Sequence, residues 1–254
     1  MGVQELEVTR GIERAMRIDL AAAFRLAVRL DLHEGVCNHL SVMLPGGKAF
    51  LLNPYGLHWS EVTASNLLTL DAEGRVLEGE GEFEKTAFYI HSRIHLANPR
   101  ATCVLHTHMP YATALTLLEG GRLEMVEQNA LRFHDDIAYD DIYNGLVVDN
   151  SEGDRLARAL GGKRVMFLAN HGVIVVGPTV AEAFDALYYL ERACRLQVLA
   201  RSALANSGGK FRPVRPEVVR DAYRMMLADA PKYAGAHFEA LKRILDREEP
   251  AYSR

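Results

Sequence analysis

Apolar positions recur three or four residues apart along several stretches of the chain, which is the spacing that lines up one face of an α-helix. This spacing predicts helices over residues 10–34, 84–97, 110–118, 152–160 and 180–205. Thr179 and Glu182 have the spacing of a capping box at the start of the last of these helices. A charged helical stretch is expected from 217 to 247, interrupted near Pro231.

Short apolar and β-branched runs, separated by turn residues, alternate with these helices and predict strands. The expected strands cover residues 39–44, 49–52, 67–70, 75–77, 102–107 and 137–139, with two more within 164–177. The segment from 122 to 149 is mostly irregular by pattern. With 254 residues, 49% of them hydrophobic, the chain can bury one large core.

We therefore expect a single domain over residues 1–254, in which 207–254 form a C-terminal helical extension. The glycine and proline spacer before the extension makes it a candidate for packing on a neighbouring subunit.

Three histidines stand where these strands end. His106 and His108 follow an apolar run and are two residues apart, so both side chains can face the same point. His171 lies in a polar triplet inside an apolar stretch, where burial without a partner would cost several kcal/mol. Three histidines with an open position are typical of a catalytic metal site. The spacing of His106 and His108 alone also fits two histidines on a solvated strand face.

Charge and composition narrow the classes of partner. The formal net charge of -4 offers no broad basic field for nucleic acid, so small molecules and copies of the chain are the expected partners. The first residues lack a cationic and apolar leader, and no stretch of eighteen apolar residues could span a membrane. We expect a cytoplasmic protein whose three cysteines are reduced.

Several motifs, taken in order, resemble the class II aldolase/adducin family over roughly residues 15 to 205. They are Asn38-His39-Leu40-Ser41, Leu51-Leu52-Asn53-Pro54-Tyr55-Gly56, Glu61-Val62-Thr63 and the two histidine motifs. The resemblance implies a three-layer α/β/α fold with a central, mainly antiparallel sheet flanked by helices. It also implies one divalent transition metal per chain, zinc first and manganese next, held by His106, His108 and His171. The resemblance further implies a homotetramer with active sites between subunits.

The chain departs from the family's sugar-phosphate aldolases at the catalytic carboxylate. Their acid–base glutamate, nineteen residues before the first histidine, falls on Ala87. Glu84 is the candidate substitute, although a glutamate at a helix start is also a favourable dipole partner. His91 resembles a histidine that many family members carry near the metal, and we assign it a catalytic role with Glu84. His95, one turn further on, is expected to face solvent or a neighbour.

The phosphate-binding positions of those aldolases are also altered. Their two serines correspond to Lys85 and Thr86, and their asparagine corresponds to His39. These three side chains could instead hold a carboxylate or a phenolate. Asn53 could line the same pocket, although asparagine is also common in such turns.

The family resemblance leaves two classes of function. The first is a metal-dependent carbon–carbon lyase, a decarboxylase or an aldolase, acting through an enolate on a small hydroxy/keto or hydroxy-aromatic carboxylate. The alternative is a non-catalytic adducin-like assembly module. Such a module has no physical need for three converging imidazoles.

Overall fold

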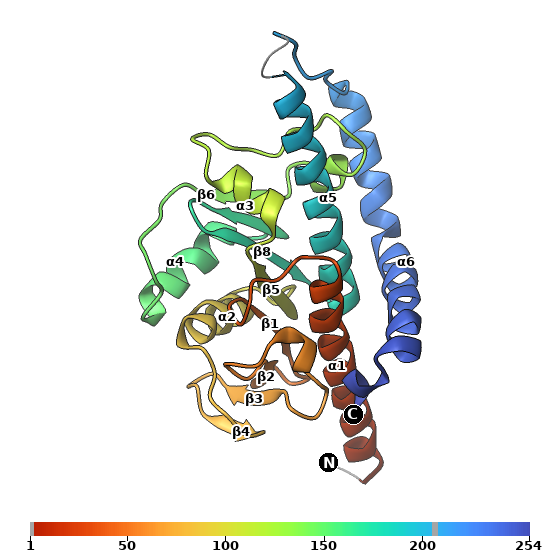
Figure 1. Ribbon diagram of the computed structural model, residues 1–254. Helices are drawn as coiled ribbons and strands as arrows, with labels where there is room; N and C mark the ends of the chain where they lie inside the picture. The colour runs from red at the N-terminus through yellow and green to blue at the C-terminus, as the bar shows by residue number, and fades with distance from the viewer. Residues whose placement is uncertain (1–2, 205–207) are drawn as a thin grey trace.

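The computed structural model describes residues 3–204 and 208–254 and is built around one mixed sheet (Figure 1). Within those residues the sheet has eight strands in the order β4-β3-β2-β1-β5-β8-β7-β6. Their bounds are β1 His39–Met43, β2 Ala49–Leu52, β3 Leu68–Asp71, β4 Val76–Glu78, β5 Cys103–Thr107, β6 Ile137–Asp140, β7 Val165–Leu168 and β8 Gly172–Gly177. All neighbours pair antiparallel except β6 and β7, which are parallel. The mainly antiparallel sheet is confirmed.

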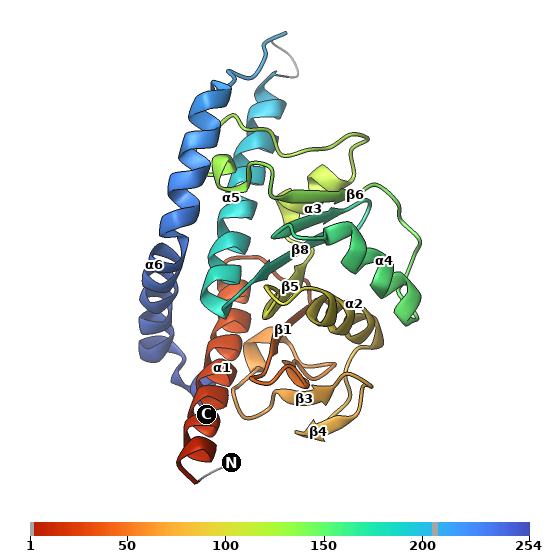
Figure 2. The ribbon, with the colours of Figure 1, turned by 180° about the vertical axis from the view of Figure 1, so that it is seen from behind.

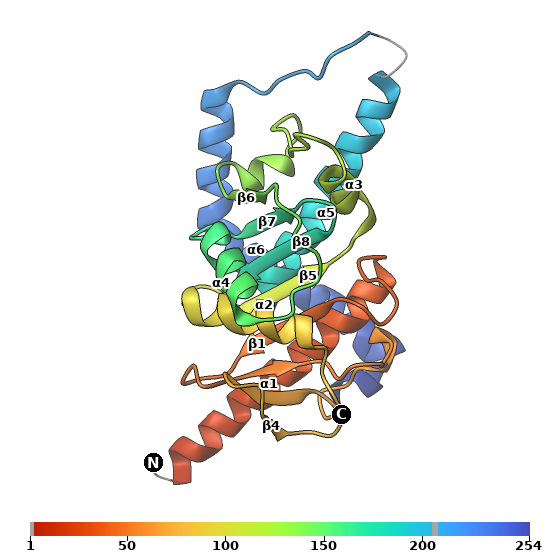
Figure 3. The ribbon, with the colours of Figure 1, turned by 90° about the vertical axis from the view of Figure 1, so that its left-hand side faces the viewer.

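Helices cover both faces of this sheet. Their bounds are α1 Val3–Arg29, α2 Lys85–Ala97, α3 Pro110–Thr116, α4 Asn150–Leu160, α5 Val180–Leu204 and α6 Pro216–Glu248. The described residues also contain the 3-10 helices η1 Trp59–Glu61, η2 Ala130–Phe133 and, after α6, η3 Pro250–Ser253. Figures 1 and 2 show α1, α5 and α6 on one side of the sheet, and Figure 3 looks onto the side that carries α2 and α4. The three-layer arrangement is confirmed.

The two faces carry separate apolar cores because neighbouring strand residues point in opposite directions. Leu105 and Val175 pack with α1 and α5 in the larger core. Val104 and Ile174, their neighbours along β5 and β8, pack with α2 and α4 instead. The continuous apolar character of β5 and β8 therefore reflects strands that are buried on both sides.

The first helix ends earlier than the apolar stripe predicts. It stops at Arg29 rather than at residue 34, because Asp31 adopts a φ of 57° and the Leu32 amide bonds back to the Ala27 carbonyl. This turn reverses the chain and leaves residues 33–38 outside the helix, next to the end of β5.

The C-terminal helix corrects one expectation. α6 continues through Pro231 without a break, and it packs along α5 of its own chain (Figure 1). The buried Ala234 and Phe238 follow the proline, and the Phe238 ring lies 5.6 Å from that of Phe184. Proline cannot donate the backbone hydrogen bond that a helix normally makes at this position. These packing contacts compensate for that loss and hold the second half of the helix in place.

Two expected boundaries fall on residues that are not described. Ala205, the predicted end of the longest helix, and Ser207, the predicted start of the extension, both lie in the gap between residues 204 and 208. Among the helices of the described ranges, none combines the length and apolar character needed to cross a membrane.

Candidate metal centre

Three histidines from two separate parts of the sequence meet at one end of the central strands. His106 is on β5, His108 follows the strand, and His171 lies in the three-residue turn between β7 and β8. One ring nitrogen of each lies within 4.8 Å of the others. His106 is buried, whereas His108 and His171 are half-buried. The cluster is therefore anchored in the sheet and open on one side.

The outer nitrogens of two of these rings are occupied by oxygen acceptors. His106 Nδ1 donates to the Val173 carbonyl at 3.0 Å. His108 Nδ1 donates to the Glu34 carboxylate at 2.5 Å. Because a carbonyl and a carboxylate can only accept, both Nδ1 atoms carry a proton, and each ring in its neutral form keeps its lone pair on Nε2. An oxygen acceptor on the outer nitrogen is the usual support for a metal-binding histidine.

The two Nε2 atoms face one another at 3.2 Å. When both rings are neutral, their lone pairs face each other, and this approach is repulsive unless a metal ion or a second proton lies between them. Zinc held tetrahedrally at 2.0–2.1 Å would place two ligand nitrogens about 3.3 Å apart. A second proton on His106 is disfavoured, since burial, together with His171 and His108, lowers the pKa of His106 well below its usual value. The donor set fits a divalent transition metal.

The backbone around the cluster is shaped to bring the rings together. Asn170 adopts a φ of 57°, which lets the turn present His171, and its amide bonds to the Thr116 carbonyl at 3.0 Å. A Cβ on Gly172 would lie 2.6 Å from both His108 Cδ2 and the Thr107 carbonyl oxygen. The β7–β8 hairpin can approach β5 this closely only with glycine at that position.

Two residues that hold His108 were missed by the sequence reasoning. Glu34 lies in the segment released by the early end of α1. Asn38, at a φ of 75°, accepts the His108 amide through Oδ1 at 3.2 Å. Both contacts span about 70 positions, so no local spacing could have revealed them. The only available signal was Asn38 itself, a polar residue directly before a predicted strand.

His39 and Glu84 form a pair beside the cluster. His39 is the cross-strand partner of His106, and their rings stack at 5.7 Å. Glu84 caps α2 by accepting the Ala87 amide at 2.7 Å, and its other close contact is His39 Nε2 at 3.2 Å. Partial burial raises the pKa of Glu84, but hydrogen bonds from His39 and from the α2 amides outweigh it and lower the pKa to about 2.

His91 and His95 both point into the protein. His91 is fully buried, and its Nδ1 lies 2.6 Å from Ser41 Oγ. The expectation that His95 faces solvent is wrong, because His95 is also buried and contacts Ser41 and the Ala101 carbonyl. The reason is helical spacing, since both histidines share the face of α2 that packs on the sheet.

The remaining candidates lie around the start of α2. Lys85 is exposed, Thr86 is half-buried, and Asn53 is buried with no partner for Oδ1 in the described residues. Within those same residues, no hydrogen bond or ion pair connects them to the three histidines. Tyr143, which the sequence reasoning did not select, lies beside the cluster, with its ring 6.3 Å from that of His171.

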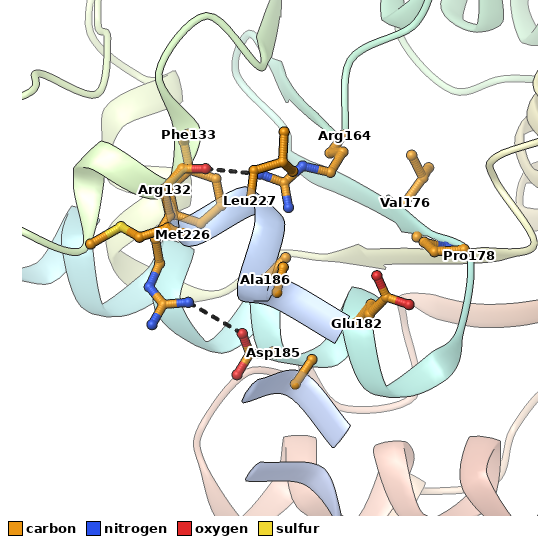
Figure 4. A pocket seen from close by; sticks show the side chains of 13 residues that line it. Arg132, Phe133, Arg164, Val176, Pro178, Glu182, Asp185, Ala186, Met226 and Leu227 are labelled. Atoms are coloured by element: carbon orange, nitrogen blue, oxygen red, sulfur yellow. Dashed lines mark hydrogen bonds and ion pairs between the residues drawn. The ribbon is translucent and has the colours of Figure 1, made fainter. Parts of the chain in front are cut away.

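Figure 4 shows a cavity away from the histidines, between η2, α5 and α6. Its basic side chains serve the fold. Arg132 pairs with Asp185 at 3.5 Å, and Arg164 donates to the Arg132 carbonyl at 2.8 Å and to Asp136. These contacts tie η2 to α5 and β7, and they leave the histidine cluster as the better candidate for chemistry.

Comparisons with known proteins give a consistent result. The family model described as class II aldolase and adducin N-terminal domain matches residues 18–198. The crystal structure of an aldolase II superfamily protein from Pseudomonas syringae is 34% identical, with a TM-score of 0.88 over 95% of this chain and 96% of that one. An L-fuculose 1-phosphate aldolase from Glaciozyma antarctica is 26% identical, with a TM-score of 0.84 over 97% and 94% of the two chains. Human beta-adducin is 35% identical over 95% of this chain and 34% of its own length.

Replacing Gly172 by alanine should weaken metal binding. The added Cβ would push His108 and the end of β5 away from the hairpin, and losses of support around a ligand typically cost about 10- to 100-fold in metal affinity. Isothermal titration calorimetry with zinc measures the affinity of each variant. Gly162→Ala is the matched control, because a Cβ there meets nothing within 4 Å. Equal zinc affinity in both variants would contradict the account.

The cap of α2 should make stability depend on pH in the acid range. The folded state lowers the pKa of Glu84 from 4.5 to about 2, so the ionised carboxylate stabilises the protein above about pH 4.5 and stops doing so as the pH falls towards 2. The difference in unfolding free energy between wild type and Glu84→Gln should shrink over this window, as urea titrations at each pH would show. A difference that stays constant between pH 4.5 and pH 2 would refute the prediction.

Proposed function

The chain belongs to the class II aldolase and adducin family, and on this premise we propose that it is a metal-dependent carbon–carbon lyase. The proposed substrate is a small hydroxy/keto or hydroxy-aromatic carboxylate. The observation that supports the proposal is the convergence of ring nitrogens, with Nε2 of His106 and Nε2 of His108 3.2 Å apart and His171 beside them. Three neutral imidazoles with one open side are the ligand set of catalytic rather than structural zinc.

A divalent metal, zinc first and manganese next, would be held by His106, His108 and His171. When bound, it would supply a Lewis acid that polarises a carbonyl or hydroxyl oxygen, so that negative charge can develop on the neighbouring carbon. Glu34 would keep His108 in the required tautomer, as the Val173 carbonyl does for His106.

Proton transfer requires a group other than the missing carboxylate. Ala87 is fully buried and its side chain carries no polar atom. Glu84 is strongly ionised and engaged with α2 and His39, so we assign it the task of orienting His39 in the site. His91 has a free ring nitrogen, and we assign it the role of proton acceptor.

The start of α2 is the proposed place for the rest of the substrate. Lys85 presents an exposed ammonium group that can attract a carboxylate, and Thr86 follows it in the first turn of α2. His39 and Asn53 each keep a buried polar atom without a partner in the described residues, and either can take up a substrate group. By the family resemblance we also propose a homo-oligomer, most simply a tetramer.

A non-catalytic assembly module is the second candidate. It is favoured by the 35% identity to human beta-adducin over nearly the whole chain, although the match covers only a third of that protein. Chelation separates the two roles. A catalytic metal can be removed while the fold remains, whereas a fold that depends on its metal unfolds without it.

The lyase proposal is tested with zinc- or manganese-loaded protein and a panel of hydroxy, keto and hydroxy-aromatic carboxylates. We expect release of carbon dioxide or of an aldehyde from at least one of them, abolished by chelator and restored by metal. His171→Ala should lower the rate by at least about 100-fold, as expected when a stabilising electrostatic group is lost.

The matched control is His134→Ala, whose imidazole contacts Asp135 and Tyr223 and lies outside the histidine cluster. Its rate should equal that of the wild type. Full metal loading without turnover of any substrate would contradict the lyase proposal and favour the assembly module.

A further inference from the structure

A buried chain of hydrogen bonds connects the loop before β5 with the helix that covers the site. It begins at the Ala101 carbonyl, which lies 2.6 Å from His95 Nδ1. His95 Nε2 lies 2.8 Å from Ser41 Oγ, and Ser41 Oγ lies 2.6 Å from His91 Nδ1. Ser41 on β1 therefore bridges two histidines of α2, and all three side chains are buried.

The direction of each hydrogen bond follows from the carbonyl at the start. The Ala101 carbonyl can only accept, so His95 carries its proton on Nδ1. Burial lowers the pKa of His95 to about 4, so the ring is neutral at pH 7 and Nε2 is an acceptor. The single hydroxyl proton of Ser41 goes to that nitrogen. Ser41 Oγ can then only accept from His91, so His91 Nδ1 must be the donor.

This order leaves His91 with an unused lone pair. Its Nδ1 holds the proton, and its Nε2 is buried with no hydrogen-bond partner in the described part of the chain. Polar atoms that are buried without a partner are rare and costly, which indicates that a donor reaches this nitrogen in the working protein. The orphaned nitrogen is thus a feature that packing alone does not explain.

His91 lies next to the histidine cluster. The ring of His39 is 5.7 Å from the ring of His91 and also 5.7 Å from that of the proposed ligand His106. Ala87 occupies the same helix one turn earlier, so α2 offers an imidazole where it lacks a carboxylate.

We propose that Ser41 and His95 are positioning residues that fix His91 as the Nδ1–H tautomer, so that its Nε2 is a ready proton acceptor for a substrate hydroxyl. The acceptor role rests on the proposed lyase function, whereas the tautomer does not. In an aldol cleavage the hydroxyl proton passes to His91 Nε2 and the O–H electron pair forms the new carbonyl. The carbon–carbon bond breaks, its electron pair stays on the other fragment, and that carbon takes the proton back from His91.

The tautomer is measured by long-range ¹H–¹⁵N correlation spectra of zinc-loaded, full-length protein labelled at histidine, with His91→Gln to assign the signals. We expect a protonated Nδ1 and an unprotonated Nε2 for His91 in the wild type. Ser41→Ala should shift His91 towards the Nε2–H form. Ser92→Ala is the matched control, because it removes a buried hydroxyl from the adjacent residue of α2 that takes no part in the chain of hydrogen bonds.

The rate of the lyase reaction tests the acceptor role. Ser41→Ala should lower kcat about 10- to 100-fold with KM and zinc content unchanged, while Ser92→Ala should behave as wild type. A wild-type His91 protonated on Nε2, or a tautomer insensitive to Ser41→Ala, would overturn the proposal. A His91 tautomer that shifts in Ser41→Ala while kcat stays unchanged would overturn the acceptor role. If the wild type shows the expected tautomer, and Ser41→Ala shifts it, but no lyase activity is found, the proposed function is refuted. The positioning role of Ser41 and His95 is then still supported.

Discussion

Two imidazole nitrogens, Nε2 of His106 and Nε2 of His108, lie 3.2 Å apart at the end of β5. The outer nitrogen of each ring faces an oxygen acceptor, so in the neutral rings both Nε2 lone pairs point at the same place, where a metal ion can take them up. Burial makes protonation a poor solution for His106. The arrangement is therefore best explained as a metal site held ready by its surroundings.

Several elements of the fold hold the three histidines together at this site. The early turn after α1 releases Glu34 to reach His108, and glycine at position 172 allows the hairpin that carries His171 to approach β5. On the other face of the sheet, α2 packs over β1 and β5 and brings His91 and His95 onto Ser41. The metal ligands and the proposed proton acceptor therefore come from different elements that meet over the same strands.

The sequence was informative where the pattern is local. The strands, the order of helices and the three candidate ligands follow from apolar periodicity, turn residues and a two-residue histidine spacing. Long-range partners could not be found this way, since Glu34, Asn38 and Ser41 act through contacts about 50 to 75 positions away. These contacts depend on which strands lie side by side in the sheet, and the spacing of residues along the sequence does not show that order.

Some errors came from signals that were present. His91 and His95 share one helical face with Ile94 and Ala87, a pattern that already indicated burial for both histidines. Pro231 suggested a break in α6, but the helix continues because Ala234 and Phe238 hold its second half on the protein. In both cases tertiary packing outweighed a local preference.

The most direct test is the metal content of the purified protein, measured by elemental mass spectrometry on the wild type beside His106→Ala and His108→Ala. Our account predicts about one zinc or manganese per chain in the wild type and loss of the metal from both variants, with native circular dichroism. A wild-type protein that binds neither metal, even when both are offered in excess, would contradict it.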